Sequence, residues 1–249
     1  KVSNDTLYFS NVYSYLVYVK ATVQADSWIK KSALLQTTPL GSGMWFGAMD
    51  WNGLDFVVSN AQAQKVYKID GTTFNVYDSV SVAQTATGLA ITGTDTWLCD
   101  PPADKKLHRI NATTGATLFS STSAPERPIM LATQGNDIWM IDDEGDMYTY
   151  STLTDNFTLK HAGLGIQGGG TMFRPDMVIK DGYAYVCLFT SVIKLSLSTY
   201  MVEETYVLDA TAGYAIGIAH NGSAFYTINL DVNSFATGTP VLSLNKIEL

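Results

Sequence analysis

Two of the three arginines of this chain lie in similar contexts that could bind an anionic or hydroxyl-rich ligand. Arg127 is preceded by Glu126 and followed by proline, and Arg174 is also followed by proline. A guanidinium can hold a carboxylate or a pair of sugar hydroxyls through two parallel hydrogen bonds. The alternative is that each arginine pairs with an aspartate of a neighbouring repeat and so joins the two repeats.

A second group of candidate residues is acidic. The segment 142–146, Asp-Asp-Glu-Gly-Asp, has four carboxylates in five residues, and Asp100 lies in a comparable loop. Calcium needs several oxygen ligands, but this spacing differs from that of an EF-hand loop. We therefore expect a solvated acidic turn. The candidate ligand-binding residues are Arg127, Arg174, Glu126, Asp100, Asp142 and Asp143.

The histidines and cysteines do not form a recognisable catalytic or metal-binding pattern. His108, His161 and His220 fall at different positions of the repeat described below, which favours structural or surface roles. Cys99 and Cys187 are expected in repeats separated by a third, too far apart for a disulfide, as buried free thiols. The sequence therefore indicates no catalytic residue, no metal site and no cofactor.

These residues belong to a chain that repeats about every 43 residues. The anchors of the repeat are Leu7, Phe56, Trp97, Trp139, Tyr185 and Phe225, at steps of 49, 41, 42, 46 and 40 residues. Such a period accommodates four short strands, and alternation of apolar and polar residues is widespread whereas helical spacing is not sustained. The sequence predicts an all-β, six-bladed β-propeller with four-stranded antiparallel blades.

The six blades are expected within a single domain that covers residues 1–249. Their approximate ranges are 1–40, 41–84, 85–126, 127–164, 165–213 and 214–249. If the strands of a blade are called A to D from the centre outward, the D–A and B–C loops share one face of the ring. The candidate ligand-binding residues are expected on that face, where loops vary freely over a rigid frame.

Four N-glycosylation sequons begin at Asn4, Asn111, Asn156 and Asn221. All four are expected in A–B or C–D turns, on the face opposite the candidate ligand-binding residues. Glycans there would suit an exported protein. The alternative is chance, because turns are rich in Asn, Ser and Thr.

Both terminal repeats are expected to be one strand short. The first begins at its B strand and includes 16–19 as its C strand, and the last ends at its C strand, so the residue count does not indicate that one terminus completes the blade of the other. An absent strand leaves unpaired backbone groups at an edge. Three explanations stay open: strands outside this chain, irregular pairing of the terminal residues, or a strand donated by a partner protein.

Two segments resemble the repeats of YVTN, NHL and quinoprotein-like propellers. They are KVYKIDGTTFNVYDS at 65–79 and KLHRINATTGATLFSS at 106–121. This resemblance implies a fold that many unrelated functions use. The tandem tryptophan signature of quinone-dependent dehydrogenases, the WD dipeptides of WD40 repeats and the Asp-box of sialidases are missing from the chain.

Composition narrows the range of partners. A net charge of −8 argues against binding to a nucleic acid backbone. No apolar stretch reaches the 18 or so residues of a membrane span. The chain starts with Lys1 rather than Met, which we interpret as removal of a leader or as a piece of a longer polypeptide.

The sequence favours a non-enzymatic binding or assembly module. It would be an extracellular or virion-surface propeller that contacts a glycan or a protein within a larger assembly. The alternative is a propeller enzyme, a lyase or hydrolase, that uses Arg127, Arg174 and an acidic loop residue at the mouth of the channel.

Overall fold

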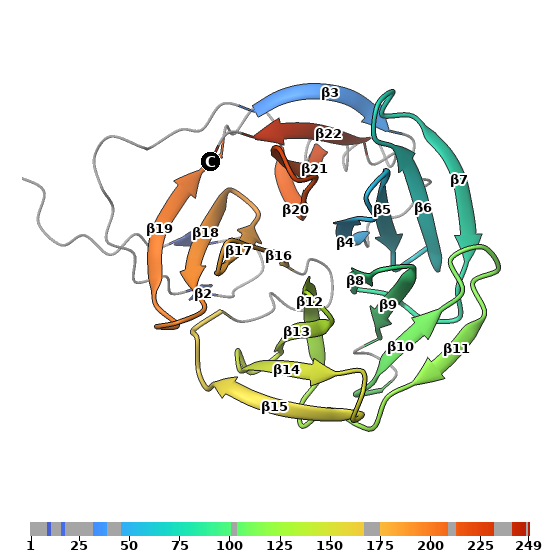
Figure 1. Ribbon diagram of the computed structural model, residues 1–249. Helices are drawn as coiled ribbons and strands as arrows, with labels where there is room; N and C mark the ends of the chain where they lie inside the picture. The colour runs from blue at the N-terminus through green and yellow to red at the C-terminus, as the bar shows by residue number, and fades with distance from the viewer. Residues whose placement is uncertain are drawn as a thin grey trace, which may run out of the picture.

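The computed structural model describes residues 9–10, 16–17, 32–38, 46–100, 104–166, 175–208, 213–231, 241–247 and 249. Within these residues the regular elements are β-strands, and they form five four-stranded antiparallel sheets arranged as the blades of a propeller (Figure 1). An all-β propeller with four-stranded blades is therefore confirmed. The expected number of six blades is wrong.

The strands of each blade run in order from the axis of the ring to its rim. Blade I contains β4 (Phe46–Trp51), β5 (Asp55–Asn60), β6 (Lys65–Asp70) and β7 (Val76–Ser81). Blade II contains β8 (Gly88–Thr92), β9 (Asp95–Cys99), β10 (Leu107–Ile110) and β11 (Thr117–Ser120). Blade III contains β12 (Pro128–Gln134), β13 (Asp137–Asp142), β14 (Met147–Ser151) and β15 (Asn156–His161). Blade IV contains β16 (Asp176–Lys180), β17 (Tyr183–Leu188), β18 (Ser191–Ser196) and β19 (Val202–Val207).

Blade V is completed by a strand from the other end of the chain. Its inner strands are β20 (Tyr214–His220), β21 (Phe225–Asp231) and β22 (Val241–Ile247), and its outer strand is β3 (Ser32–Thr38). β3 pairs antiparallel with β22 from Leu242↔Thr38 to Ile247↔Ser32 (Figure 1). The last blade is thus complete, and the expectation of a three-stranded last blade is wrong because β3 pairs with the outer edge of β22.

The expected first blade, 1–40, is not a blade. Leu16–Val17 (β2) pairs with Phe9–Ser10 (β1) in a separate two-stranded sheet, and the third strand of this region is β3 of blade V. The anchor Leu7 lies outside the described residues. The other five anchors all lie on second strands, namely β5, β9, β13, β17 and β21.

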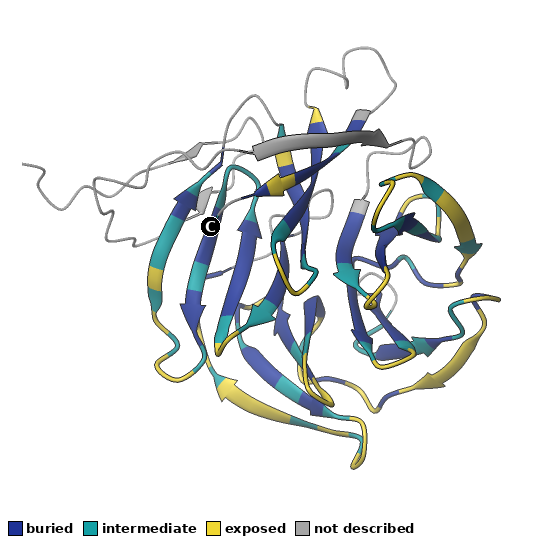
Figure 2. Ribbon diagram, turned by 45° about the horizontal axis from the view of Figure 1, so that its top comes forward, coloured by how far each residue is buried: buried dark blue, intermediate teal, exposed yellow. Residues whose placement is uncertain are grey.

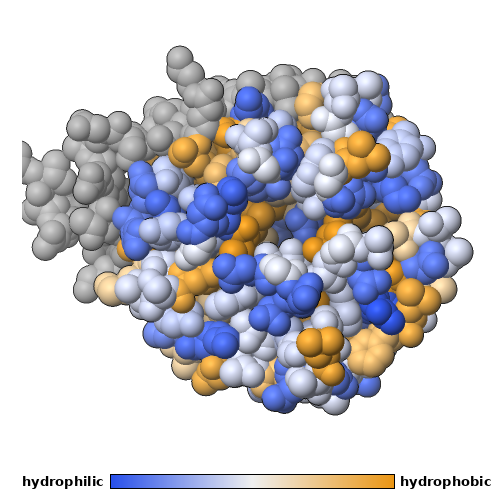
Figure 3. Space-filling view, viewed as in Figure 1, coloured by the Kyte–Doolittle hydropathy of each residue, from blue (hydrophilic) through white to orange (hydrophobic). Residues whose placement is uncertain are grey.

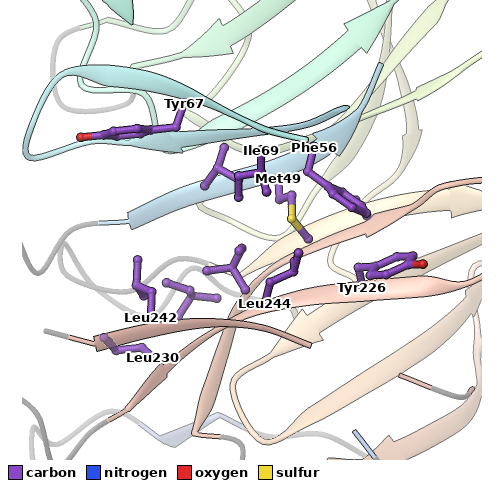
Figure 4. Close-up of a cluster of buried hydrophobic side chains, with 12 residues drawn as sticks. Met49, Phe56, Tyr67, Ile69, Tyr226, Leu230, Leu242 and Leu244 are labelled. Atoms are coloured by element: carbon purple, nitrogen blue, oxygen red, sulfur yellow. The ribbon is translucent and has the colours of Figure 1, made fainter. Parts of the chain in front are cut away.

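Among the described residues, five buried apolar clusters join neighbouring blades, one at each interface of the ring. The cluster between blades V and I contains Met49, Phe56 and Ile69 on one side and Tyr226 and Leu244 on the other (Figure 4). It joins the first blade to the last and closes the ring through side chains as well as through β3.

Because blades pack on both sides, the second strands are buried on both faces. β5 is buried over all six residues, whereas the outer strand β11 is exposed over all four of its residues. Figure 2 shows this gradient, with buried residues toward the axis and exposed residues on the rim. A strand buried on both faces reads as a nearly continuous apolar run, which is why the anchors were visible in the sequence.

No helix in the described part of the chain has both the length and the apolar character needed to span a membrane.

Candidate functional site at the mouth of the ring

The B–C and D–A loops lie at one end of the blades, and we call this the mouth face. A space-filling view down the ring shows polar and apolar residues interspersed on one of its two faces (Figure 3). The mouth face carries every candidate ligand-binding residue except Arg174, which lies outside the described residues.

Below the mouth, a buried carboxyl group links the inner strands of three blades. Asp176, the first residue of β16, is 1 % exposed, and its Oδ2 accepts hydrogen bonds from Met49 N and Ile218 N, both at 2.9 Å. The pairing registers of β4 and β20 place both N–H groups on the edge that faces the axis. Asp176 therefore joins the inner strands of blades IV, V and I.

A second carboxyl group makes a similar link between blades I and II. Asp50 Oδ2 accepts a hydrogen bond from Ile91 N at 2.8 Å, and its Oδ1 accepts one from Trp51 N at 2.7 Å. Desolvation raises the pKa of Asp50 to about 7, although both amide hydrogen bonds lower it. Burial also raises the pKa of Asp176 well above its usual value, and the nearby Asp50 carboxyl adds to that rise.

Arg127 is exposed on the mouth face and is anchored through its main chain. Its carbonyl accepts a hydrogen bond from Asp143 N at 3.0 Å, which ties the D–A loop before β12 to the B–C loop after β13. Within the part of the chain that the structure describes, no carboxylate forms an ion pair with its guanidinium. The alternative in which Arg127 pairs with a neighbouring blade is not seen among these residues.

Glu126 and Asp100 are already engaged in holding loops. Glu126 Oε2 lies 2.7 Å from Lys105 Nζ, so the carboxylate beside Arg127 is neutralised by a lysine of blade II. Asp100 is 5 % exposed, and its Oδ2 accepts a hydrogen bond from Thr85 N at 2.8 Å, which fixes the loop before β8. Both side chains organise the mouth face.

Asp142 is the most perturbed acidic residue of the mouth loops. Its side chain is fully buried, and its Oδ1 accepts hydrogen bonds from Glu144 N at 3.1 Å and Asp146 N at 2.8 Å. Desolvation raises the pKa of Asp142 to about 6, with smaller contributions from the charges of Asp146 and Asp143. The turn is therefore built around an inward carboxyl and is not simply a solvated acidic turn.

The oxygens of this acidic turn are largely used by the protein itself. Asp146 Oδ1 accepts a hydrogen bond from Gly163 N at 2.7 Å, and Asp143 Oδ1 is buried with no hydrogen-bond partner among the described residues. Over the same described ranges, no group of three or more His, Cys, Asp or Glu side chains is arranged to hold a metal ion.

Three of the sequon asparagines lie at turns on the face opposite the mouth. Asn111 follows β10, Asn156 begins β15 and Asn221 follows β20, whereas Asn4 lies outside the described residues. Asn111 and Asn221 use their Oδ1 atoms to accept amide hydrogen bonds from the next residues of their turns. Cys99 and Cys187 are buried thiols that are not joined in a disulfide, as expected.

One arrangement of polar side chains was missed by the sequence reasoning. His108 lies between Ser120, with Nδ1 to Oγ at 2.9 Å, and Asp104, with Nε2 to Oδ1 at 3.1 Å. Ser120 is the cross-strand neighbour of His108, and Asp104 precedes His108 by four residues. Pairing the predicted C and D strands of this repeat through the turn 111–116 could have found the contact.

No protein-family model matches this chain, and no curated protein matches it in sequence. Solved structures do match its fold. A glutaminyl cyclase of Myxococcus xanthus superimposes with a TM-score of 0.63 at 12 % identity, covering 90 % of this chain and 100 % of the cyclase chain. Regucalcin of Agrobacterium tumefaciens, a calcium-binding protein, superimposes with a TM-score of 0.58 at 9 % identity, covering 90 % and 97 %. At these identities the likeness shows the propeller fold alone.

Proposed function

We propose that the mouth face of this protein binds a carboxylate-bearing glycan at Arg127 without catalysing a reaction there. The observation that carries the proposal is Arg127, an exposed guanidinium whose main chain is tied to Asp143. A cation on a fixed loop can form charge-assisted hydrogen bonds with a carboxylate without first ordering that loop.

The close approach of the inner strands below the mouth supports contact at the surface. The carboxyl group of Asp176 joins β16 to β4 and β20 there. Gly217 lies so close to Met49 that a Cβ added at Gly217 would lie 3.2 Å from Met49 Cβ. A ligand therefore meets the loops above this level.

We also propose that the protein lies outside the cell or on an exposed surface, within a larger assembly. The face opposite the mouth would then carry glycans at Asn111, Asn156 and Asn221. We also propose that the repeats of this chain are of the YVTN, NHL or quinoprotein-like type, which their C strands resemble. Strand donation by a partner at the last blade is no longer needed, because β3 already pairs with β22.

An array of glycans with and without sialic or uronic acids tests the binding function. We expect the protein to bind acidic glycans, and Arg127→Ala to weaken binding about 10- to 100-fold, the usual effect of losing a charged hydrogen bond. Arg109→Ala is the matched control, because that guanidinium is already bound to Asp95 at 3.1 Å. Equal binding by wild type and Arg127→Ala would refute the site, and binding to acidic peptides alone would assign a protein partner instead.

One observation favours a second function, an enzyme at the mouth. The pKa of Asp142 is raised to about 6, and its Oδ2 is buried with no hydrogen-bond partner in the described part of the chain. A raised pKa suits a carboxyl for proton exchange in a lyase or hydrolase reaction, and because Asp142 is buried, this exchange requires the turn 142–146 to open. The fold of the cyclase from Myxococcus xanthus shows that a similar ring can carry an enzyme. Turnover abolished by Asp142→Asn with intact glycan binding would favour this second function.

A further inference from the structure

The chain Asp104–His108–Ser120 has the connectivity of an activated nucleophile. His108 is 7 % exposed and is held between the two other side chains, at 3.1 Å from Asp104 Oδ1 and 2.9 Å from Ser120 Oγ. A hydroxyl, an imidazole and a carboxylate in this order are the elements of nucleophilic catalysis by serine. The three residues come from the B–C loop, β10 and β11 of blade II.

The partners of the ring assign the tautomer of His108. A carboxylate only accepts hydrogen bonds, so Nε2 carries the proton that is donated to Asp104. Nδ1 is then the basic nitrogen, and it accepts the hydrogen bond of the Ser120 hydroxyl. The ring is therefore in the form needed to remove a proton from Ser120.

The carboxylate of Asp104 is fixed in place. Its Oδ1 also accepts a hydrogen bond from Lys106 N at 3.0 Å, and its own N–H donates to Asp100 O at 3.0 Å. The nearby ammonium of Lys105 is bound to Glu126 instead. Asp104 thus holds His108 in a fixed orientation.

Ser120 is open to a substrate. It is an exposed residue at the end of the outermost strand of blade II. Ser121 N donates to Leu107 O at 2.9 Å, so the next pair, His108↔Ser120, is a non-hydrogen-bonded pair. The N–H of Ser120 therefore points to the open edge of β11, where it can donate to the oxygen of a reacting carbonyl.

We propose that Ser120 is a nucleophile for acyl transfer from small carboxylic esters, with His108 as general base and Asp104 as positioning residue. Ser120 Oγ bonds to the ester carbonyl carbon as its proton moves to His108 Nδ1. The bond to the alcohol then breaks, and the alcohol takes that proton. Water attacks the acyl-serine in the same way, which releases the carboxylic acid and returns the proton to Ser120. This activity is separate from the binding function proposed above.

A fluorophosphonate probe, which phosphonylates activated serines, tests the nucleophile directly. We expect peptide mass mapping to locate the label at Ser120, with labelling about 100-fold slower in His108→Gln, as for loss of a general base. Ser81→Ala is the matched control, because Ser81 is also exposed at the end of an outer strand but pairs with Lys65. No label at Ser120, or equal labelling in His108→Gln, overturns the proposal.

A second measurement does not depend on how well the His108 variant folds. In Ser120→Cys, His108 should promote thiolate formation, so iodoacetamide should alkylate this thiol at least about tenfold faster at neutral pH than the thiol of Ser81→Cys. Adding Asp104→Asn should move the pH midpoint of that alkylation, because the imidazole loses its carboxylate partner. Equal rates for the two thiols, or an unmoved midpoint, contradict the assigned roles.

Discussion

Met49 N donates a hydrogen bond of 2.9 Å to Asp176 Oδ2 across 127 residues of sequence. The two residues lie on the innermost strands of blades I and IV, and blade V lies between these blades around the ring. The same oxygen also accepts from Ile218 N of blade V. One carboxyl group therefore links the inner strands of three blades and satisfies amides that the β-sheets leave unpaired.

Removing this acceptor should destabilise the ring. Asp176→Leu leaves two buried N–H groups without partners, so we expect the free energy of unfolding in urea to fall by about 2–5 kcal/mol. Asp176→Asn keeps a carbonyl oxygen at the site and should cost less. Asp78→Asn is the control, since it breaks only the surface pair with Lys68 and should cost less than about 1 kcal/mol. Equal free energies of unfolding for Asp176→Leu and wild type would mean that the hydrogen bonds of Asp176 do not stabilise the ring.

The raised pKa of Asp50 should also make the contribution of this residue to stability larger in acid than near neutrality. The folded-state pKa of Asp50 is about 7 and its ordinary value is 3.8, so the folded state holds this proton more tightly than the unfolded state. The contribution to stability is complete below pH 3.8 and is lost as pH rises through 7, by at most about 1.4 kcal/mol per pH unit. Urea midpoints between pH 4 and 8 measure this loss, and Asp50→Asn should reduce the slope. A slope unchanged by that substitution contradicts the assignment.

Closure by β3 predicts a specific disulfide. Thr37 and Ser243 are cross-strand partners, and paired Cα atoms lie within the range that a disulfide can span. Under mild oxidation, Thr37→Cys with Ser243→Cys should form an intramolecular bond and raise the melting temperature. The pair Thr37→Cys with Ser79→Cys, which places the second thiol on blade I, should stay reduced. Intermolecular bonds, or two free thiols in the first variant, would be incompatible with closure by β3.

The repeat could be predicted because its anchors are large apolar residues, of which Phe56, Trp97 and Tyr185 are buried and Trp139 and Phe225 are partly buried. Phe56, Trp97, Trp139, Tyr185 and Phe225 lie on the second strands, which pack between two blades and read as apolar runs. The number of blades could not be predicted from the anchors alone. Leu7 has the right spacing, but the described strands that follow it, β1 and β2, form a two-stranded sheet outside the five blades. β3 has the composition of an outer strand, Ser-Ala-Leu-Leu-Gln-Thr-Thr, with nothing local to say which blade it completes.

The site was less predictable than the fold. Asp142, Asp143, Arg127 and Glu126 belong to loops of the mouth face, as the repeat implied, but the partners that now define their roles are mostly backbone amides and a lysine of another blade. Every residue has a backbone amide, and a lysine of another blade is far away in the chain, so neither kind of partner can be recognised from the sequence. Asp176 could not be recognised as the residue that joins three blades, because its two amide donors come from strands far away in the chain.

The direct test of the link between blades IV, V and I is hydrogen exchange at the amides of Met49 and Ile218. If the Asp176 carboxyl holds these amides, both should exchange as slowly as the slowest amides of the buried strands β5 and β21, and faster in Asp176→Leu. Exchange of both amides in the wild type at the rate of the Ser120 amide, on the open edge of β11, would show that the amides are open to water and would contradict the link.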